Sequence, residues 1–207
     1  MLAIFYSSSN LRSVMSPASQ SANLVSVIED VEFAATLSSQ LGSLSSELLL
    51  VPRNGADVAA LPFDWTKAKA YYGEYCPLGG GNDCPDGQFD NDCTHFVAHG
   101  LSKSSIIVNL PSVTCYNGVC IRVAELAAAF KNAAAKYTNV KKIGDISKTR
   151  EGDFCFVVSW FGLATDHAMV LADIMGPNGG KVYGHTNPRC GQQVDLTGQT
   201  LVIYRIE

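Results

Sequence analysis

The feature that most restricts the fold of this chain is a change in residue pattern near Gly144. Before it, apolar residues recur at helical spacing, as in residues 122–137. After it, turn signals such as Glu151-Gly152-Asp153 separate several strand-like segments. These segments are Phe154–Trp160, His167–Ala172, Lys181–Thr186 and Thr200–Ile206. Helices followed by consecutive strands predict an α+β fold in which helices pack on an antiparallel β-sheet.

Composition argues against several classes of protein. The 207 residues are 47% hydrophobic and 16% charged, with a net charge of −4. A hydrophobic chain of low net charge is not expected to be disordered. An acidic balance does not suit the basic face of a nucleic-acid-binding protein. No apolar run reaches the ~18 residues that a membrane-spanning helix needs. We therefore predict no nucleic-acid partner and no membrane span.

The chain is expected to divide at about residue 60. Residues 1–60 predict a Ser-rich arm and an amphipathic helical extension, whose apolar stripe begins at Val27 and which Pro52 ends. That helix either packs on its own domain or binds a partner. No basic segment precedes the short apolar patch at the N-terminus, so a standard signal peptide is not expected. Residues 61–207 predict one domain, which opens with a helix capped by Asp64.

A glycine-rich and acidic loop, Cys76–Asp92, lies between two predicted helices. Its carboxylates raise the question of calcium, but they do not follow the order of an EF-hand loop. The acids concerned are Asp83, Asp86, Asp90 and Asp92. The cysteine spacings do not match those of structural zinc sites either. We therefore expect no metal and no cofactor.

The seven cysteines are an odd number, so disulfide formation would leave at least one thiol over. Residues 115–120 have a central Asn-Gly pair, which predicts a hairpin with a cysteine at each side of the turn, opposite one another. The simplest pairing of six cysteines is Cys115–Cys120, Cys76–Cys84 and Cys155–Cys190, which leaves Cys93. In a reducing compartment all seven would instead be free thiols.

Cys93 is the candidate nucleophile. It follows Asn91 and Asp92, either of which can cap a helix that begins at the cysteine. The thiol would then lie in the first helical turn, where free backbone N–H groups and the helix dipole favour the reactive thiolate. The same N–H groups can form part of an oxyanion hole. Phe96 and Val97 share its side of the helix, so the thiol is expected to face the core.

A base for this thiol must come from elsewhere in the chain. His95 and His99 lie on the opposite side of the Cys93 helix and are interpreted as surface or supporting histidines. His167 begins a strand and is the candidate base. Its neighbour Asp166 would point to the other face of that strand and is interpreted as structural.

The following strand supplies candidates for a third residue. If odd-numbered positions of the two strands pair with each other, His167, His185 and Asn187 point to one face of the sheet. Either His185 or Asn187 could then orient the His167 imidazole. If odd positions pair with even ones, this arrangement is lost, and the turn sequence alone does not decide the register.

Four segments in this order resemble the NlpC/P60 superfamily of papain-like cysteine peptidases: Asp92-Cys93-Thr94-His95-Phe96-Val97, Glu151-Gly152-Asp153, Asp166-His167-Ala168-Met169-Val170 and Tyr183-Gly184-His185-Thr186-Asn187. The first is most similar to the amidase-like branch, whose motif reads Asp-Cys-Thr-Asn-Phe-Val, although His95 replaces its Asn. The resemblance covers about residues 64–207. It implies a papain-like catalytic domain with Cys93 as nucleophile, His167 as base and His185 as orienting residue.

The resemblance also implies a substrate class, namely amide bonds of bacterial cell-wall peptides. We therefore expect a cysteine hydrolase (a peptidase or amidase) acting on peptidoglycan peptides or related amides. Disulfides would suit an extracytoplasmic location, secreted or periplasmic. Delivery as an antibacterial effector is one route, and an immunity or inhibitor protein is then a candidate partner. The alternatives are a thiol acyltransferase, similar to a transglutaminase, and a non-catalytic cell-wall-binding module.

Overall fold

The computed structural model describes residues 26–27, 47–78, 91–109, 119–158, 165–186 and 188–207. Within them, three α-helices accompany a seven-stranded and a two-stranded sheet, which confirms the α+β prediction. The helices are α2 (Trp65–Tyr75), α3 (Cys93–Lys103) and α4 (Val123–Lys136). Short 3₁₀ turns, η3 (Cys76–Leu78) and η4 (Ile146–Lys148), follow α2 and precede the central strands.

The larger sheet is mostly antiparallel and runs in the order β1-β9-β5-β6-β7-β8, with β4 also paired to β9. Its central strands are β5 (Phe154–Val158), β6 (Thr165–Leu171) and β9 (Thr200–Ile206). Strands β7 (Gly179–Tyr183) and β8 (Gln192–Asp195) form one edge, whereas β1 (Ser26–Val27) and β4 (Val140–Lys142) lie beside β9. The predicted strand Thr200–Ile206 is confirmed with the same ends as β9, and β5, β6 and β7 confirm the other three with different ends. Strands β1, β4 and β8 were not predicted.

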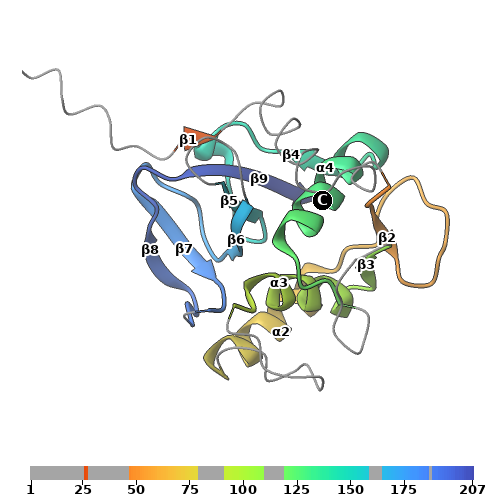
Figure 1. The fold of residues 1–207 in the computed structure, drawn as a ribbon, viewed down its shortest axis with the longest axis horizontal. Helices are drawn as coiled ribbons and strands as arrows, with labels where there is room; N and C mark the ends of the chain where they lie inside the picture. Colours follow the sequence, from red (N-terminus) through yellow and green to blue (C-terminus); the bar gives the residue numbers. More distant parts are fainter. Residues whose placement is uncertain (1–25, 28–46, 79–90, 110–118, 159–164, 187) are drawn as a thin grey trace, which may run out of the picture.

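The central strands are buried on both faces. Phe154 and Phe156 of β5 belong to a core shared with the helices, whereas Cys155 and Val157 belong to a second core on the opposite face. Figure 1 shows α2 and α3 side by side, with β7 and β8 at the far edge of the sheet. Alternate residues of one strand therefore serve two cores.

The turn before β5 forms as predicted from Glu151-Gly152-Asp153. Gly152 has φ +88°, and a Cβ there would lie 3.2 Å from a ring carbon of Trp65, so glycine suits both the backbone and the packing. The buried Asp153 carboxylate accepts hydrogen bonds from Arg205 Nε at 2.7 Å and Nη2 at 2.8 Å. This pair joins the start of β5 to the end of β9.

Three of the four predicted helices are confirmed, as α2, α3 and α4, and the fourth is not. Helix α2 begins after Asp64, whose Oδ1 accepts from Lys67 N at 3.3 Å, as an N-cap does. Helix α4 covers most of the predicted 122–137 segment. The helix expected from Val27 to Pro52 is wrong at both ends, because Ser26–Val27 pairs with β9 and Leu50–Pro52 is a strand, β2. Residues 28–46 lie outside the described residues.

The described parts of the predicted extension share the sheets and core of residues 61–207. Strand β1 pairs with β9, and β2 pairs with β3 (Ile106–Val108), which follows α3. Leu48 and Leu50 are buried in the core with the helices. The expected boundary at residue 60 therefore does not separate two cores. None of the described helices is long and apolar enough to cross a membrane.

Candidate active site

Cys93 is the first residue of α3, as predicted, but Asp92 does not cap the helix with its side chain. The Asp92 carboxylate instead reaches the loop after β7, where Oδ2 lies 2.7 Å from His185 Nδ1 and Oδ1 accepts from Thr186 N at 3.2 Å. The first intrahelical bond of α3 runs from Phe96 N to Asp92 O. Asp92 therefore fixes the start of α3 against the sheet rather than satisfying the first helical turn.

The Cys93 side chain is buried, and burial raises the pKa of its thiol. Hydrogen bonds from the Ala168 and Thr94 backbone N–H groups and from the Thr94 hydroxyl lower the pKa, and the Asp92 charge raises it. The expectation that the helix start favours the thiolate is therefore wrong. Loss of hydration raises the pKa of the thiol by more than the hydrogen-bond donors lower it. The resting residue is a thiol that needs a base.

The Ala168 N–H reaches this thiol because the β6–β7 ladder stops short. Along β6, Leu171 N donates to Asp153 O on the β5 side, and Ala172 N donates to Lys181 O on the β7 side. Alternation directs Ala168 N–H to the β7 side. The residue pairs between β6 and β7 end at Val170–Tyr183, so this donor lies beyond them. The thiol is thus beside the peptide group that joins Ala168 to His167.

His167 is half-buried on β6, and its Nε2 lies 3.0 Å from Arg189 Nη1. Within the described residues, no hydrogen bond joins its ring to a carboxylate. Burial and then the Arg189 charge lower the pKa of His167 to about 4, while Asp92 acts in the opposite direction. In the described part of the chain, the Cys93 thiol lies beside the backbone N–H that follows His167, and no hydrogen bond joins the thiol to the His167 ring. At neutral pH His167 is therefore a neutral imidazole and Cys93 is a neutral thiol.

The register of β6 and β7 pairs even positions with odd ones. Val170 lies opposite Tyr183 and Leu171 opposite Val182. His167 pairs with Val157 and so shares the face of the second core, whereas Ala168 faces the helices. The register that would align His167 with His185 and Asn187 is therefore not the one that forms. Asn187 lies outside the described residues.

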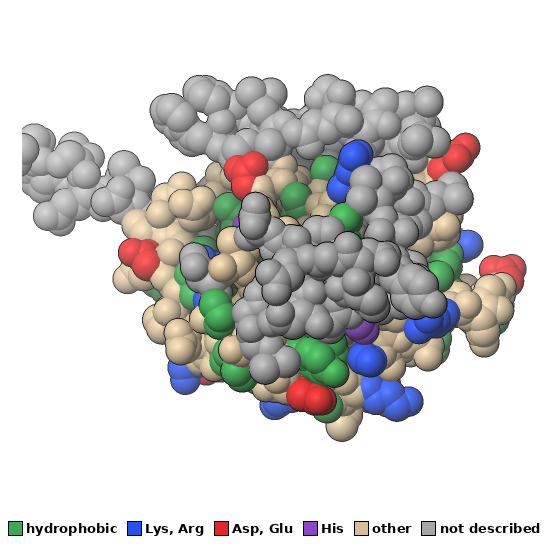
Figure 2. Space-filling view, turned by 60° about the horizontal axis from the view of Figure 1, so that its bottom comes forward, with side chains coloured by type: hydrophobic (Ala, Val, Ile, Leu, Met, Phe, Trp, Pro, Cys, Tyr) green, Lys and Arg blue, Asp and Glu red, His purple; other side chains and the backbone are tan. Residues whose placement is uncertain are grey.

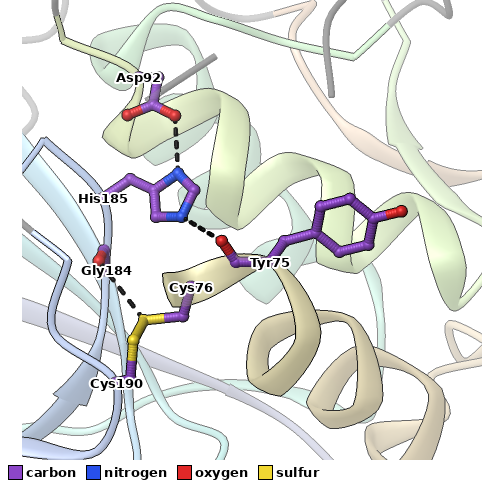
Figure 3. Close-up of a disulfide and its surroundings, with 6 residues drawn as sticks. All are labelled: Tyr75, Cys76, Asp92, Gly184, His185 and Cys190. Atoms are coloured by element: carbon purple, nitrogen blue, oxygen red, sulfur yellow. Dashed lines mark hydrogen bonds and ion pairs between the residues drawn. A yellow bond between two sulfur atoms is a disulfide. The ribbon is translucent and has the colours of Figure 1, made fainter. Parts of the chain in front are cut away.

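His185 turns toward the helices instead of toward His167. Its ring stacks on Phe96 with centroids 4.0 Å apart, and it is 2% exposed. Nδ1 lies 2.7 Å from Asp92 Oδ2, and Nε2 lies 2.9 Å from the Tyr75 carbonyl oxygen (Figure 3). The Tyr75 carbonyl only accepts, so Nε2 carries a proton, and Nδ1 is occupied by its contact with Asp92. Its nitrogens are not available to orient His167.

A disulfide joins Cys76, at the end of α2, to Cys190, after the loop that carries His185. The Cα atoms are 5.5 Å apart, and Cys76 Sγ lies 3.9 Å from the Gly184 carbonyl oxygen (Figure 3). The bridge and the His185–Tyr75 contact tie the same two segments together. They hold the loop 184–190 against α2, and this loop is what meets both Asp92 and His167.

The predicted cysteine pairings need correction. Cys76–Cys84 and Cys155–Cys190 are wrong, because Cys76 and Cys190 bond to each other across 114 positions and Cys155 is a buried free thiol. Cys120 is also a free thiol, 3.4 Å from the Arg122 carbonyl oxygen. Its predicted partner Cys115 lies outside the described residues, as does Cys84. Cys93 is free, as expected.

His95 and His99 are both buried, so the interpretation of them as surface histidines is wrong. His99 stacks on Tyr71 with centroids 4.7 Å apart, and the two histidine rings meet edge to face at 5.4 Å. Helix α3 is enclosed on all sides because α2, the sheet and β3 surround it. Among the described residues, no group of three or more His, Cys, Asp or Glu side chains could hold a metal ion.

Sequence reasoning missed two contributors to this site. Arg189 contacts His167, and the Ala168 N–H contacts the thiol. A single arginine in a loop does not form a recognisable sequence motif. Whether a backbone N–H is left without a strand partner depends on where the pairing of two strands ends, which the sequence does not show. The one sequence signal near Arg189 is its position four residues after His185, in the His-Thr-Asn-Pro-Arg segment.

The surface around α2 and α3 carries both signs of charge. Figure 2 shows basic side chains at the border of this face with acidic ones among them. A hollow of about 360 Å³ on this face is lined by Lys67 and Lys103 but also by Glu74 and tyrosines. On the described part of this face, the charges are mixed rather than gathered into one basic surface.

Alkylation should separate the three described free thiols by pH. Burial raises the pKa of Cys120 and of Cys155 to about 12, whereas the N–H donors at Cys93 oppose the rise. Because the thiolate reacts, the rate at Cys93 should grow about tenfold per pH unit from neutral pH upward. The alkylation rate of each thiol is measured by iodoacetamide labelling of the unreduced protein at several pH values, followed by peptide mapping. Equal labelling of Cys120 or Cys155, or a rate at Cys93 that ignores pH, would contradict this.

Comparison with known proteins adds no relative. No family model matches the chain, no curated protein matches it, and no solved structure matches it. The NlpC/P60 resemblance therefore remains an expectation from the motifs, and the functional argument depends on the geometry described above.

Proposed function

We propose that this protein is a cysteine hydrolase that cleaves amide bonds, with Cys93 as nucleophile and His167 as general base. One observation carries the proposal: the thiol of a helix-starting cysteine contacts the backbone N–H of Ala168, which is bonded directly to His167. Thiol catalysis needs a nitrogen base close to the nucleophile, and this contact brings the backbone of His167 beside the thiol. The residue order also agrees with the motif resemblance.

The chemistry follows from the resting protonation states. His167 is neutral and Cys93 is a thiol, so the imidazole removes the thiol proton as sulfur attacks the substrate carbonyl. The C–N bond then breaks, and the imidazolium gives its proton to the leaving amine. Water, deprotonated by the same imidazole, cleaves the resulting thioester to a carboxylic acid and regenerates the thiol.

Two further groups support the transition state. The N–H groups of the first turn of α3 are not capped by the Asp92 side chain and can donate to the developing oxyanion. The Ala168 N–H and Thr94 N–H stabilise negative charge on sulfur. The rigid buried pair of Asp92 and His185 holds the start of α3 in place, so these donors are pre-oriented.

Peptidoglycan peptides are the proposed substrate, on the basis of the motif resemblance. The disulfide Cys76–Cys190 supports an extracytoplasmic workplace for such an enzyme, because disulfides persist in oxidising compartments.

Product analysis tests this function. Purified peptidoglycan treated with the protein should release equal amounts of new amino and carboxyl termini. The products are identified by mass spectrometry, with and without an added primary amine. Amine incorporation in place of the carboxyl terminus would make the protein an acyltransferase, and binding without any new termini would make it a cell-wall-binding module.

A further inference from the structure

Arg189 is a side chain that the mechanism above does not use. It is half-buried in the loop between β7 and β8, where its backbone N–H donates to Gly184 O at 3.1 Å. The next residue, Cys190, is fixed to α2 by the disulfide. From this tethered position Arg189 Nη1 reaches His167 Nε2 at 3.0 Å. The loop therefore holds a guanidinium directly on the proposed base.

This contact makes the base inactive. A guanidinium only donates, so His167 Nε2 is the acceptor and the proton of the neutral ring lies on Nδ1. In a neutral imidazole only the unprotonated ring nitrogen can accept a proton, and Arg189 already donates to this nitrogen. His167 cannot take the Cys93 proton until Arg189 moves away from Nε2.

The charge of Arg189 is not balanced by a carboxylate in the described part of the chain. Its side-chain contact there is with the uncharged His167 ring. This contact uses one of the five N–H donors of the guanidinium. Asp92, the carboxylate that acts on His167, already binds His185 with one oxygen and Thr186 N with the other. A half-buried guanidinium in this state binds an incoming carboxylate more strongly than an imidazole, because two parallel charged hydrogen bonds replace one.

We propose that Arg189 binds a carboxylate of the substrate and in doing so releases His167 Nε2 to act as base. The inference rests on the proposed amide hydrolysis and adds a substrate class to it: peptides with a free carboxylate close to the cleaved bond. Arg189 is a positioning and specificity residue in this scheme. Substrates without the carboxylate leave the base occupied, so they are cleaved slowly even when they bind.

A matched pair of substrates tests the proposal. Purified peptidoglycan is compared with the same material after its carboxylates have been converted to carboxamides with carbodiimide and ammonia. The wild-type protein should release amine from the untreated material at least ~10-fold faster, as expected for a charge-assisted pair. Arg189→Gln should remove this preference and should also speed cleavage of the amidated material, because nothing then occupies His167 Nε2. A purely structural role would slow cleavage of both.

Lys181→Gln is the control. Lys181 is exposed on β7, and its charge can be removed without touching His167. This variant should keep the wild-type preference. A preference that survives in Arg189→Gln, or that is lost equally in Lys181→Gln, would overturn the proposal.

Binding separates this inference from the proposed function. Soluble stem peptides, with free or amidated carboxylates, are titrated calorimetrically into Cys93→Ala, with and without Arg189→Gln. Tighter binding of the free carboxylate that depends on Arg189 supports the recognition role even if the wild-type protein cleaves nothing. If the Cys93→Ala protein that keeps Arg189 binds the two peptides equally, the recognition role is overturned even if the wild-type protein cleaves them.

Discussion

Replacing Asp92 by alanine should lower the free energy of unfolding by about 3–5 kcal/mol, the usual cost of removing one partner of a buried ion pair. Asp92 is 1% exposed and His185 is 2% exposed, and their contact is 2.7 Å long. Without the carboxylate, the buried His185 Nδ1 loses its partner and Thr186 N loses its acceptor. Thr186 also has φ +80°, a conformation that its N–H bond to Asp92 and its hydroxyl bond to Asn91 help to hold.

Asp64→Ala is the matched control for this prediction. Asp64 also precedes a helix, but its side chain is 41% exposed, and it accepts from Lys67 N and pairs with the Lys67 ammonium group. Its removal should cost about 1 kcal/mol, as for an ordinary N-cap. Asp92→Asn should fall between the two alanine variants, because the amide keeps an acceptor oxygen and loses the charge. Urea unfolding followed by circular dichroism measures all three. If Asp92→Ala costs no more than Asp64→Ala, Asp92 is only a helix cap.

The helices and strands were predictable where the signal is local. The Asp64 cap lies next to its helix, and Thr200–Ile206 is apolar because it is buried on both faces. The predicted helix from Val27 failed because residues at its two ends pair with strands far away in sequence, β9 and β3. Helical periodicity shows only how apolar residues are spaced. Pairing with distant strands then determined the backbone conformation of these residues.

The candidate site was predictable only in part. Cys93 at a helix start and His167 on a strand follow from local patterns. The role of Asp92 does not, because its partner His185 is 93 positions away and a local cap explains the same residue. The Cys76–Cys190 bridge spans 114 positions, and sequence proximity favoured other pairs. The thiol pKa depended on burial, which a helix-dipole argument does not include.

The register between β6 and β7 shows why a plausible triad could not be read from the sequence. A shift of one residue moves every side chain to the other face of the sheet. The ladder pairs Leu171 with Val182, so odd-numbered residues of β6 lie opposite even-numbered residues of β7. His167 and the odd-numbered His185 therefore do not share a face of the sheet. His185 consequently became part of the scaffold, and Arg189 became the residue that contacts His167.

Replacing Cys93 by alanine should reduce amide cleavage by a factor on the order of 10⁴ or more, as for loss of a covalent nucleophile. The fold should persist, because a small buried side chain replaces another of similar shape. Cys155→Ala is the matched control, since it also removes a buried free thiol, from the opposite core. That variant should cleave within about twofold of wild type if Cys155 has only a packing role.

The most direct test of Cys93 as nucleophile is the mass of the trapped intermediate. Wild-type protein is mixed with soluble stem peptide, quenched in acid within the first turnovers and digested for mass spectrometry. We expect a thioester adduct of one acyl fragment on the peptide that contains Cys93, present in Cys155→Ala and absent in Cys93→Ala. Cleavage at the wild-type rate by Cys93→Ala, or an adduct on a different residue, would contradict the mechanism.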